Sequence, residues 1–213
     1  MPANKESSAF VSQAYSLTDD KKSHVDFYRK WAADYDYEML DKLGYTSPST
    51  IASLLIDNLP EKSSRIIDIG CGTGLTCTLL HEQGYTHLEG IDLSPDMLLV
   101  ARHRNIYRSL FTGDLNLPLD VESDIYDAAI SSGTFTHGHV GAEPLDEVIR
   151  ILKPGGILAI TVHRDLWQTH GFETKLESLV SSNTIEYITL EEGAYYKQGA
   201  LEGWFCVYRK KII

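Results

Sequence analysis

The sequence predicts one α/β domain built on a doubly wound, mostly parallel, seven-stranded Rossmann-like sheet. From Arg65 onward, short apolar runs alternate with stretches of helical periodicity. Most of these runs are continuously apolar, as in strands that are buried on both faces of a parallel sheet. The 213 residues are also enough for one well-cored domain and rather few for two.

The residues ahead of this alternation have a different character. Residues 1–20 are rich in serine, alanine and short polar side chains, so we expect a mobile tail, followed by a single domain over 21–213. Between 23 and 43 large apolar side chains recur at every fourth position, which predicts a helix. Ser47-Pro48 resembles a helix start, and Pro60 ends a second helix at Leu59. We expect residues 21–60 to form a helical lid and 65–213 to form the sheet core.

The alternation defines the elements of the sheet. The expected strands are 65–69, 87–92, 110–112, 126–131, 156–162, 184–190 and 203–210. The expected helices between them are 75–83, 95–105, 144–152 and about 173–180. Right-handed crossovers through these helices give a sheet that is covered on both faces.

The first strand runs directly into a glycine-rich turn, Ile69-Gly70-Cys71-Gly72-Thr73-Gly74. Glycine lets a ligand approach the backbone closely and permits the positive φ of a tight turn. The spacing is G-x-G-x-G, whereas a dinucleotide site has G-x-G-x-x-G, so a nicotinamide-dependent oxidoreductase is disfavoured. Asp68 precedes the turn, and its carboxylate would repel a pyrophosphate but could pair with an ammonium group. A glycine turn that holds no ligand is the remaining alternative.

The pattern Asp68-x-Gly70-x-Gly72-x-Gly74 resembles the first motif of class I S-adenosylmethionine-dependent methyltransferases. The resemblance extends from about residue 27 to residue 158. It implies the class I methyltransferase fold, S-adenosylmethionine as cofactor with S-adenosylhomocysteine as product, and methyl transfer as the activity. By this resemblance Asp68, Gly70 and Gly72 hold the amino-acid end of the cofactor, and Gly74 shapes the turn.

Three further stretches match the same family. Asp92 ends the second strand and is expected to accept both ribose hydroxyls, while Met97, after a capping Ser94, lies against the adenine. Asp114 follows the third strand and is expected to accept the adenine amino group. The stretch 152–156 resembles a structural turn and receives no chemistry. Five neighbours of these motifs complete the expected cofactor-binding set: Cys71, Leu93, Gly113, Leu115 and Ser131.

An aromatic run over 26–36 narrows the resemblance to the Williams–Beuren-region methyltransferase-like branch of the family. Tyr28, Trp31 and Tyr35 fall at i, i+3 and i+7, so they share one helical face. Such a face is either an ordinary core stripe or a lid whose aromatic rings attract the sulfonium cation. The resemblance favours the lid, with all three residues at the cofactor.

The stretch after the fourth strand contains the candidates for proton removal. His137 and His139 follow this strand, and histidine titrates near neutral pH. One of them could be a general base, or both could simply line the pocket; His163 is a second-rank candidate. The remaining histidines are interpreted as surface or packing residues: His24, His81, His87, His103 and His170.

Composition restricts the partners. The stretch 131–139 lacks the Asn/Asp-Pro-Pro-Tyr run typical of nucleobase and glutamine methylation. The 19 basic against 30 acidic residues give a net charge of −11, which disfavours nucleic acid. We therefore expect a small-molecule or protein methyl acceptor. A regulatory protein that binds S-adenosylmethionine without turnover is the alternative.

The same composition bears on the compartment. The three cysteines have no CxxC spacing, so we expect a reducing compartment and no metal site. No apolar run approaches the length of a membrane span or a leader peptide, so we expect a protein of the cytoplasm or nucleus with no membrane partner. The sequence leaves the oligomeric state open.

Overall fold

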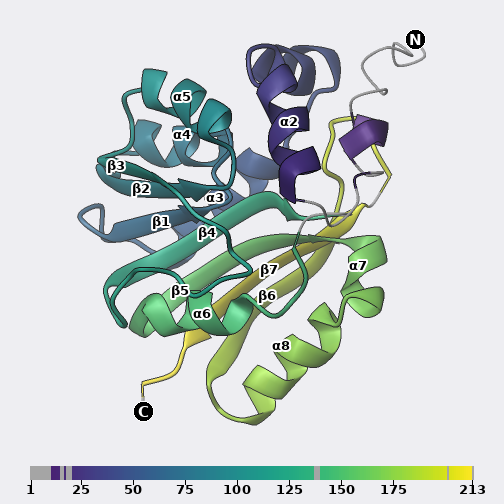
Figure 1. Ribbon diagram of the computed structural model, residues 1–213. Helices are drawn as coiled ribbons and strands as arrows, with labels where there is room; N and C mark the ends of the chain where they lie inside the picture. The colour runs from purple at the N-terminus through teal and green to yellow at the C-terminus, as the bar shows by residue number, and fades with distance from the viewer. Residues whose placement is uncertain (1–10, 15–16, 18–20, 137–139, 201, 213) are drawn as a thin grey trace.

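The computed structural model describes residues 11–14, 17, 21–136, 140–200, 202–212. Its centre is a seven-stranded sheet in the order β3-β2-β1-β4-β5-β7-β6 (Figure 1). The strands are β1 (Arg65–Ile69), β2 (His87–Asp92), β3 (Ser109–Thr112), β4 (Tyr126–Phe135), β5 (Leu152–His163), β6 (Ile185–Gly193) and β7 (Gly203–Lys210). The first five strands pair in parallel, and β7 is antiparallel to both of its neighbours. The predicted doubly wound, mostly parallel sheet is confirmed.

Helices cover both faces of this sheet. They are α2 (Lys21–Trp31), η1 (Tyr37–Lys42), α3 (Ser47–Asn58), α4 (Leu75–Glu82), α5 (Pro95–His103), α6 (Leu145–Ile151), α7 (Arg164–Thr169) and α8 (Phe172–Ser181). The alternation of side chains along β1 separates two buried clusters: Ile66 packs with residues of α3 and α4, whereas Ile67 and Ile69 pack with residues of α6 and α8. Both clusters are apolar, so the sheet is buried from both sides.

The single helix expected over 23–43 is wrong in detail. The helix α2 ends at Trp31, a turn follows, and η1 is a π-helix in which the N–H of Leu43 bonds to the carbonyl of Glu38. An α-helix has 3.6 residues per turn, so apolar positions repeated every four residues drift by roughly 40° at each step. The break and the wider π-turn keep Phe27, Trp31 and Met39 in one buried cluster.

The other predicted helices and strands are confirmed within a few residues, with two differences in extent. β4 continues to Phe135 and β5 begins at Leu152, so both strands are longer than their apolar runs suggest. The six-residue helix α7 was not predicted, because it is too short to show a periodicity. The expected tail and the histidine loop at 137–139 lie mostly or wholly outside the described residues. The carboxyl ends of β1 to β4 therefore meet at one edge of the sheet, where a ligand site is expected.

Candidate functional site

A pocket lies at the carboxyl ends of the first four strands. Its floor comes from the stretches 70–76, 92–97, 113–116 and 132–134, and its roof comes from residues of 21–48, chiefly α2. Its empty volume is about 1170 Å³, which includes space open to solvent. We use floor and roof for these two sets of lining residues below.

The glycine turn is determined by its backbone. Gly70 and Gly72 have φ of +67° and +52°, in the left-handed region that favours glycine. A Cβ on Gly70 would lie 2.2 Å from Oγ1 of Thr134, so only glycine lets the turn approach β4 this closely. A Cβ on Gly72 would meet only Met97, at 3.5 Å, and would occupy the pocket itself. The turn is therefore shaped to bring bare backbone against a ligand.

Asp92 joins this turn to the second strand. One carboxylate oxygen accepts the backbone N–H of Gly72 at 2.8 Å, and the other accepts that of Ser94 at 2.8 Å. Burial raises the pKa of Asp92, and these backbone bonds oppose the rise. The Ser94 side chain caps α5 by accepting the N–H of Met97 at 3.3 Å, as the sequence predicts. Asp92 lines the pocket, where its oxygens can accept further hydrogen bonds.

Asp68 lies beneath the turn and is fully buried. Its Oδ2 accepts the hydroxyl of Tyr107 at 2.7 Å, while Oδ1 has no hydrogen-bond partner among the described residues. Burial raises the pKa of Asp68 to about 7, against the hydrogen bond from Tyr107, with the charge of Asp92 adding to the rise. The structure thus leaves one oxygen of a buried carboxyl unsatisfied, beneath the turn and outside the pocket lining.

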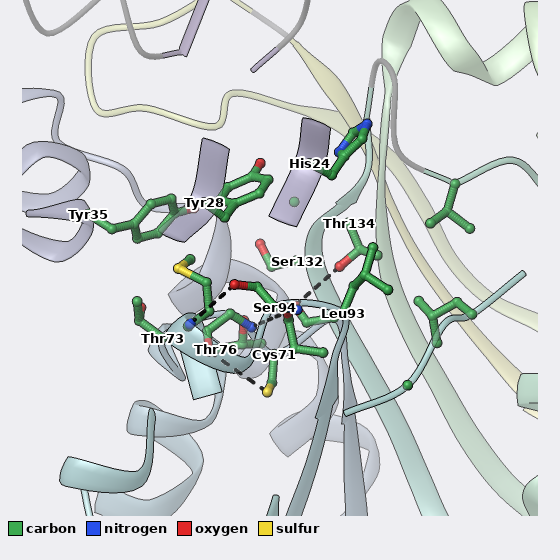
Figure 2. A pocket seen from close by; sticks show the side chains of 18 of the residues that line it. His24, Tyr28, Tyr35, Cys71, Thr73, Thr76, Leu93, Ser94, Ser132 and Thr134 are labelled. Carbon is green, nitrogen blue, oxygen red and sulfur yellow. Dashed lines mark hydrogen bonds between the residues drawn. The ribbon is translucent and has the colours of Figure 1, made fainter. Parts of the chain in front are cut away.

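The roof is formed largely by α2, which stands over the strand ends (Figure 1). Figure 2 shows His24, Tyr28 and Tyr35 on the side of the pocket opposite the glycine-turn residues. Trp31 does not line this pocket. It is 2% exposed, packs edge-on against Tyr35 at a ring separation of 4.6 Å, and donates its Nε1–H to Glu38 at 2.9 Å. The predicted aromatic face is thus divided between pocket and core.

The pocket brings most of the predicted cofactor-binding residues together: Tyr28, Tyr35, Gly70, Cys71, Gly72, Asp92, Leu93, Met97, Gly113, Asp114 and Leu115. Asp68, Trp31 and Ser131 lie outside the lining. The Ser131 hydroxyl donates to the carbonyl of Ile69 at 2.6 Å and is fully buried, which indicates a structural contact between β4 and β1.

The structure leaves the two first-choice predicted bases untested, whereas it describes the second-rank candidate. His137 and His139 lie outside these residues. His163 caps α7, where its Nδ1 accepts the backbone N–H of Asp165 at 3.2 Å, and it is not part of the pocket lining.

Sequence reasoning missed His24, which was interpreted as a surface or packing residue. Its side chain is buried and lines the pocket. The available signal was its position four residues before Tyr28, which places both on one helical face. It also missed Tyr45 and Ser132, whose hydroxyls lie 3.3 Å apart in the same pocket.

A second, smaller hollow adjoins the pocket and shares Tyr28, Tyr35, Tyr45 and Gly133 with it. Its empty volume is about 400 Å³, including space open to solvent. Its other walls include the aromatic rings of Trp31, Tyr195 and Tyr196 together with Thr136. The described residues that line this hollow carry no charged side chain, so the space suits an uncharged, apolar or aromatic group.

The described residues contain neither a candidate metal cluster nor a candidate membrane-spanning helix. Within 11–14, 17, 21–136, 140–200, 202–212, no three or more His, Cys, Asp or Glu side chains gather as they would around a metal ion. In the same part of the chain, no helix combines the length and apolar character needed to cross a membrane.

The chain is similar to known methyltransferases. Residues 67–160 match a family model described as a methyltransferase domain. Methyltransferase-like protein 27 of Homo sapiens is 34% identical over 157 residues, which are 72% of this chain and 62% of that protein. The chain therefore spans less than two thirds of this relative's length.

Solved structures share the fold. The [4+2]-cyclase SpnF superposes with a TM-score of 0.69 at 18% identity, covering 93% of this chain and 99% of that one. A complex between the Haloferax volcanii Trm112 methyltransferase activator and a methyltransferase gives 0.65 at 19% identity, covering 87% and 98%. At such identities the likeness shows a common fold, and the expected class I sheet architecture is confirmed.

Proposed function

The chain carries a methyltransferase domain on the class I methyltransferase fold, and from this premise we propose that it transfers a methyl group from S-adenosylmethionine to a small-molecule or protein acceptor. The observation that carries the proposal is the convergence of the glycine turn, Asp92 and Asp114 on one pocket. The narrower likeness to the Williams–Beuren-region branch stays a prediction, as does a location in the cytoplasm or nucleus.

The residues of the floor fit the parts of this cofactor. Asp92 would accept the ribose hydroxyls, since it lines the pocket and each of its oxygens can accept a hydrogen bond beyond the backbone N–H that it already accepts. Met97 would lie against the adenine and Asp114 would accept its amino group. The buried Asp68 would balance the ammonium group above the bare backbone of Gly72.

S-adenosylmethionine supplies a methyl group already activated on a sulfonium, so the protein has little covalent chemistry to perform. The chain must align the acceptor, exclude water and, where the acceptor carries a proton, remove it. Tyr28 and Tyr35 in the roof present aromatic rings to the pocket, and such rings attract a cation. The roof would thus both hold the sulfonium and keep water away.

The smaller hollow is the proposed place for the body of the acceptor. It opens beside the cofactor pocket across Tyr45 and Gly133, and its lining is uncharged. A negatively charged protein with such a lining would bind nucleic acid poorly, which favours a small, largely apolar acceptor. His24 joins His137 and His139 as a candidate base, because its side chain lines the cofactor pocket.

A cofactor-binding regulatory protein without turnover is the second candidate. The structural neighbour SpnF is named a [4+2]-cyclase, so the fold by itself does not establish methyl transfer. The test is S-adenosylhomocysteine release from S-adenosylmethionine in the presence of fractionated metabolites and cell extract. We expect release that depends on one fraction and is lost in Asp92→Ala. Tight cofactor binding without release in any fraction would favour the regulatory role.

A further inference from the structure

The glycine turn is fixed by a side chain from the N-terminal segment as well as by its own strand. Thr73 stands between Gly72 and Gly74, lines the pocket and is 1% exposed. Its hydroxyl donates to Oδ1 of Asp36 at 2.5 Å. Asp36 lies 37 positions earlier, between α2 and η1. A carboxylate of the roof segment thus holds a residue of the cofactor turn.

Arg104 completes the arrangement from the end of α5. Its Nη2 forms an ion pair with Oδ2 of Asp36, and its Nε–H donates to the backbone carbonyl of Thr73 at 2.6 Å. Each of the three residues therefore contacts the other two. We call Asp36, Thr73 and Arg104 the latch.

The latch links the two sides of the pocket. Asp36 directly follows Tyr35, which is one of the roof residues, and Thr73 is one of the floor residues. The ion pair is only partly exposed, with 22% of the Arg104 side chain and 34% of the Asp36 side chain accessible. Charged hydrogen bonds of this kind are stronger than neutral ones, and solvent screens them less than fully exposed pairs.

We propose that Asp36 and Arg104 are positioning residues that set the cofactor turn through Thr73 and couple its geometry to the roof. Without the latch, Thr73 loses a charged acceptor and the turn can sample other arrangements. Cofactor binding must then order the turn and the roof separately, which lowers affinity. The inference rests on the proposed function in one respect, namely that the pocket takes S-adenosylmethionine.

The first test is calorimetric titration of the full chain with S-adenosylhomocysteine. Asp36→Asn keeps the shape of the side chain but removes its charge, so we expect affinity to fall about tenfold. Asp41→Asn is the matched control, since Asp41 is exposed in the same segment, and it should leave affinity unchanged. Arg104→Gln should also weaken binding, whereas Arg102→Gln, at an exposed position of α5, should not. Unchanged affinity in Asp36→Asn overturns the proposal.

A double-variant cycle separates positioning from general destabilisation. Within the latch, the effect of Asp36→Asn should largely disappear when Arg104→Gln is already present, because the two side chains act on Thr73 together. Thr73→Ser keeps the hydroxyl and should retain affinity, while Thr73→Val should lose it. Fully additive effects, or equal binding by Thr73→Ser and Thr73→Val, would contradict the latch.

A third measurement does not depend on the ligand. In the protein without cofactor, Asp36→Asn should speed amide exchange both around 72–74 and around 35–38, and Asp41→Asn should not. If the wild-type protein binds no S-adenosylhomocysteine, while Asp36→Asn still speeds exchange at both segments, the proposed function is overturned and the latch is supported. Faster exchange at only one of the two segments would overturn the latch itself.

Discussion

The floor and the roof of the pocket are held in different ways. The floor is held by backbone hydrogen bonds of the sheet, in which β1 pairs with β2 and β4. The turn and loop beyond the strands continue this pairing: the N–H of Cys71 donates to the carbonyl of Ile91, and the N–H of Gly113 donates to the carbonyl of Asp92. The hydrogen bonds and ion pairs that tie the roof segment to the floor are instead made by side chains, among them those of Asp36, Lys21 and Tyr45. Backbone ladders tolerate most substitutions, so the floor should keep its shape while the roof responds to single changes.

The largest expected effect is on turnover, and it shows whether the roof or the stretch after β4 supplies the general base. Replacing the correct one of His24, His137 and His139 by alanine should lower turnover by roughly 10²–10⁴-fold and leave cofactor affinity nearly unchanged. A loss of turnover in His24→Ala assigns the base to the roof, whereas a loss in one of the other two variants assigns it to the stretch that follows β4 in the sequence. The measurement is kcat with the identified acceptor, with exposed His81→Ala as the control. Full turnover in all three variants would mean that positioning alone carries the reaction.

The second prediction divides the roof itself. Trp31 belongs to the core cluster and Tyr28 to the pocket. Trp31→Ala should therefore cost about 3–5 kcal/mol of unfolding free energy without ligand, as for other large buried aromatic residues. Tyr28 is only partly buried against the same cluster, so Tyr28→Ala should lower that free energy less, while it speeds S-adenosylhomocysteine dissociation.

Chemical denaturation and stopped-flow dissociation measure the two quantities. If Trp31→Ala leaves the stability of the ligand-free protein unchanged, Trp31 belongs to a lid, as the resemblance indicated, and not to the core. Fast amide exchange over 28–35 without cofactor, slowed by S-adenosylhomocysteine, would further support a lid made of the whole segment.

The third prediction concerns the floor. Asp92→Ala should weaken S-adenosylhomocysteine binding at least tenfold, because ribose hydroxyls lose a charged acceptor, at about 1.5–3 kcal/mol for each bond. The N–H of Gly72 loses its acceptor as well, so the turn would also loosen. Calorimetry measures the affinity, and Asp120→Ala at an exposed position is the control. Equal affinity in a folded Asp92→Ala protein would remove Asp92 from the site.

The sequence predicted the floor well because its chemistry is local. Asp92 ends a strand whose apolar pattern is contiguous, and Gly70 and Gly72 adopt the positive φ that their spacing implies. Parallel strands bring their carboxyl ends to one edge, so three short motifs were enough to place the pocket. The position of Asp68 was not predicted. Its side chain packs beneath the turn against Tyr107, which lies 39 positions away in the sequence, and such a contact is not visible in a local pattern.

The roof could be predicted only in part, because its contacts are long-range. The i to i+4 spacing of His24 and Tyr28 shows that they share a face, but not that this face covers the pocket. Tyr45 meets Ser132 across 87 positions, and no local pattern announces such a contact. The π-turn of η1 likewise arises from packing, since it keeps Met39 in the core.

The fourth prediction uses the pH dependence of Asp68. Its pKa of about 7 lies above the unfolded value of 3.8, so between these values the folded protein binds more protons and loses stability as pH rises. An ammonium group beside Asp68 would favour the ionised form, so binding releases a proton. S-adenosylhomocysteine affinity should therefore rise up to about tenfold between about pH 6 and 8.

Calorimetry in buffers of different ionisation enthalpy would measure this proton release directly. Asp68→Asn should remove the pH dependence, because an amide does not titrate. If the dependence persists unchanged in Asp68→Asn, it belongs to another group of the floor, and Asp92 becomes the first candidate because its pKa is also raised by burial.

The smallest expected effect is at the ion pair between Lys21 of the roof and Asp114 of the floor. Lys21 lies 3.2 Å from Asp114, but 59% of its side chain is exposed, and exposed ion pairs contribute little. Lys21→Gln also frees Asp114 to accept the adenine amino group, so the loss of the pair and the gain of an acceptor oppose each other. We expect S-adenosylhomocysteine affinity to change about twofold or less, and we expect this small change to disappear at high salt. A salt-insensitive loss as large as that of Asp36→Asn would show that the roof is fixed from the start of α2 rather than through the latch.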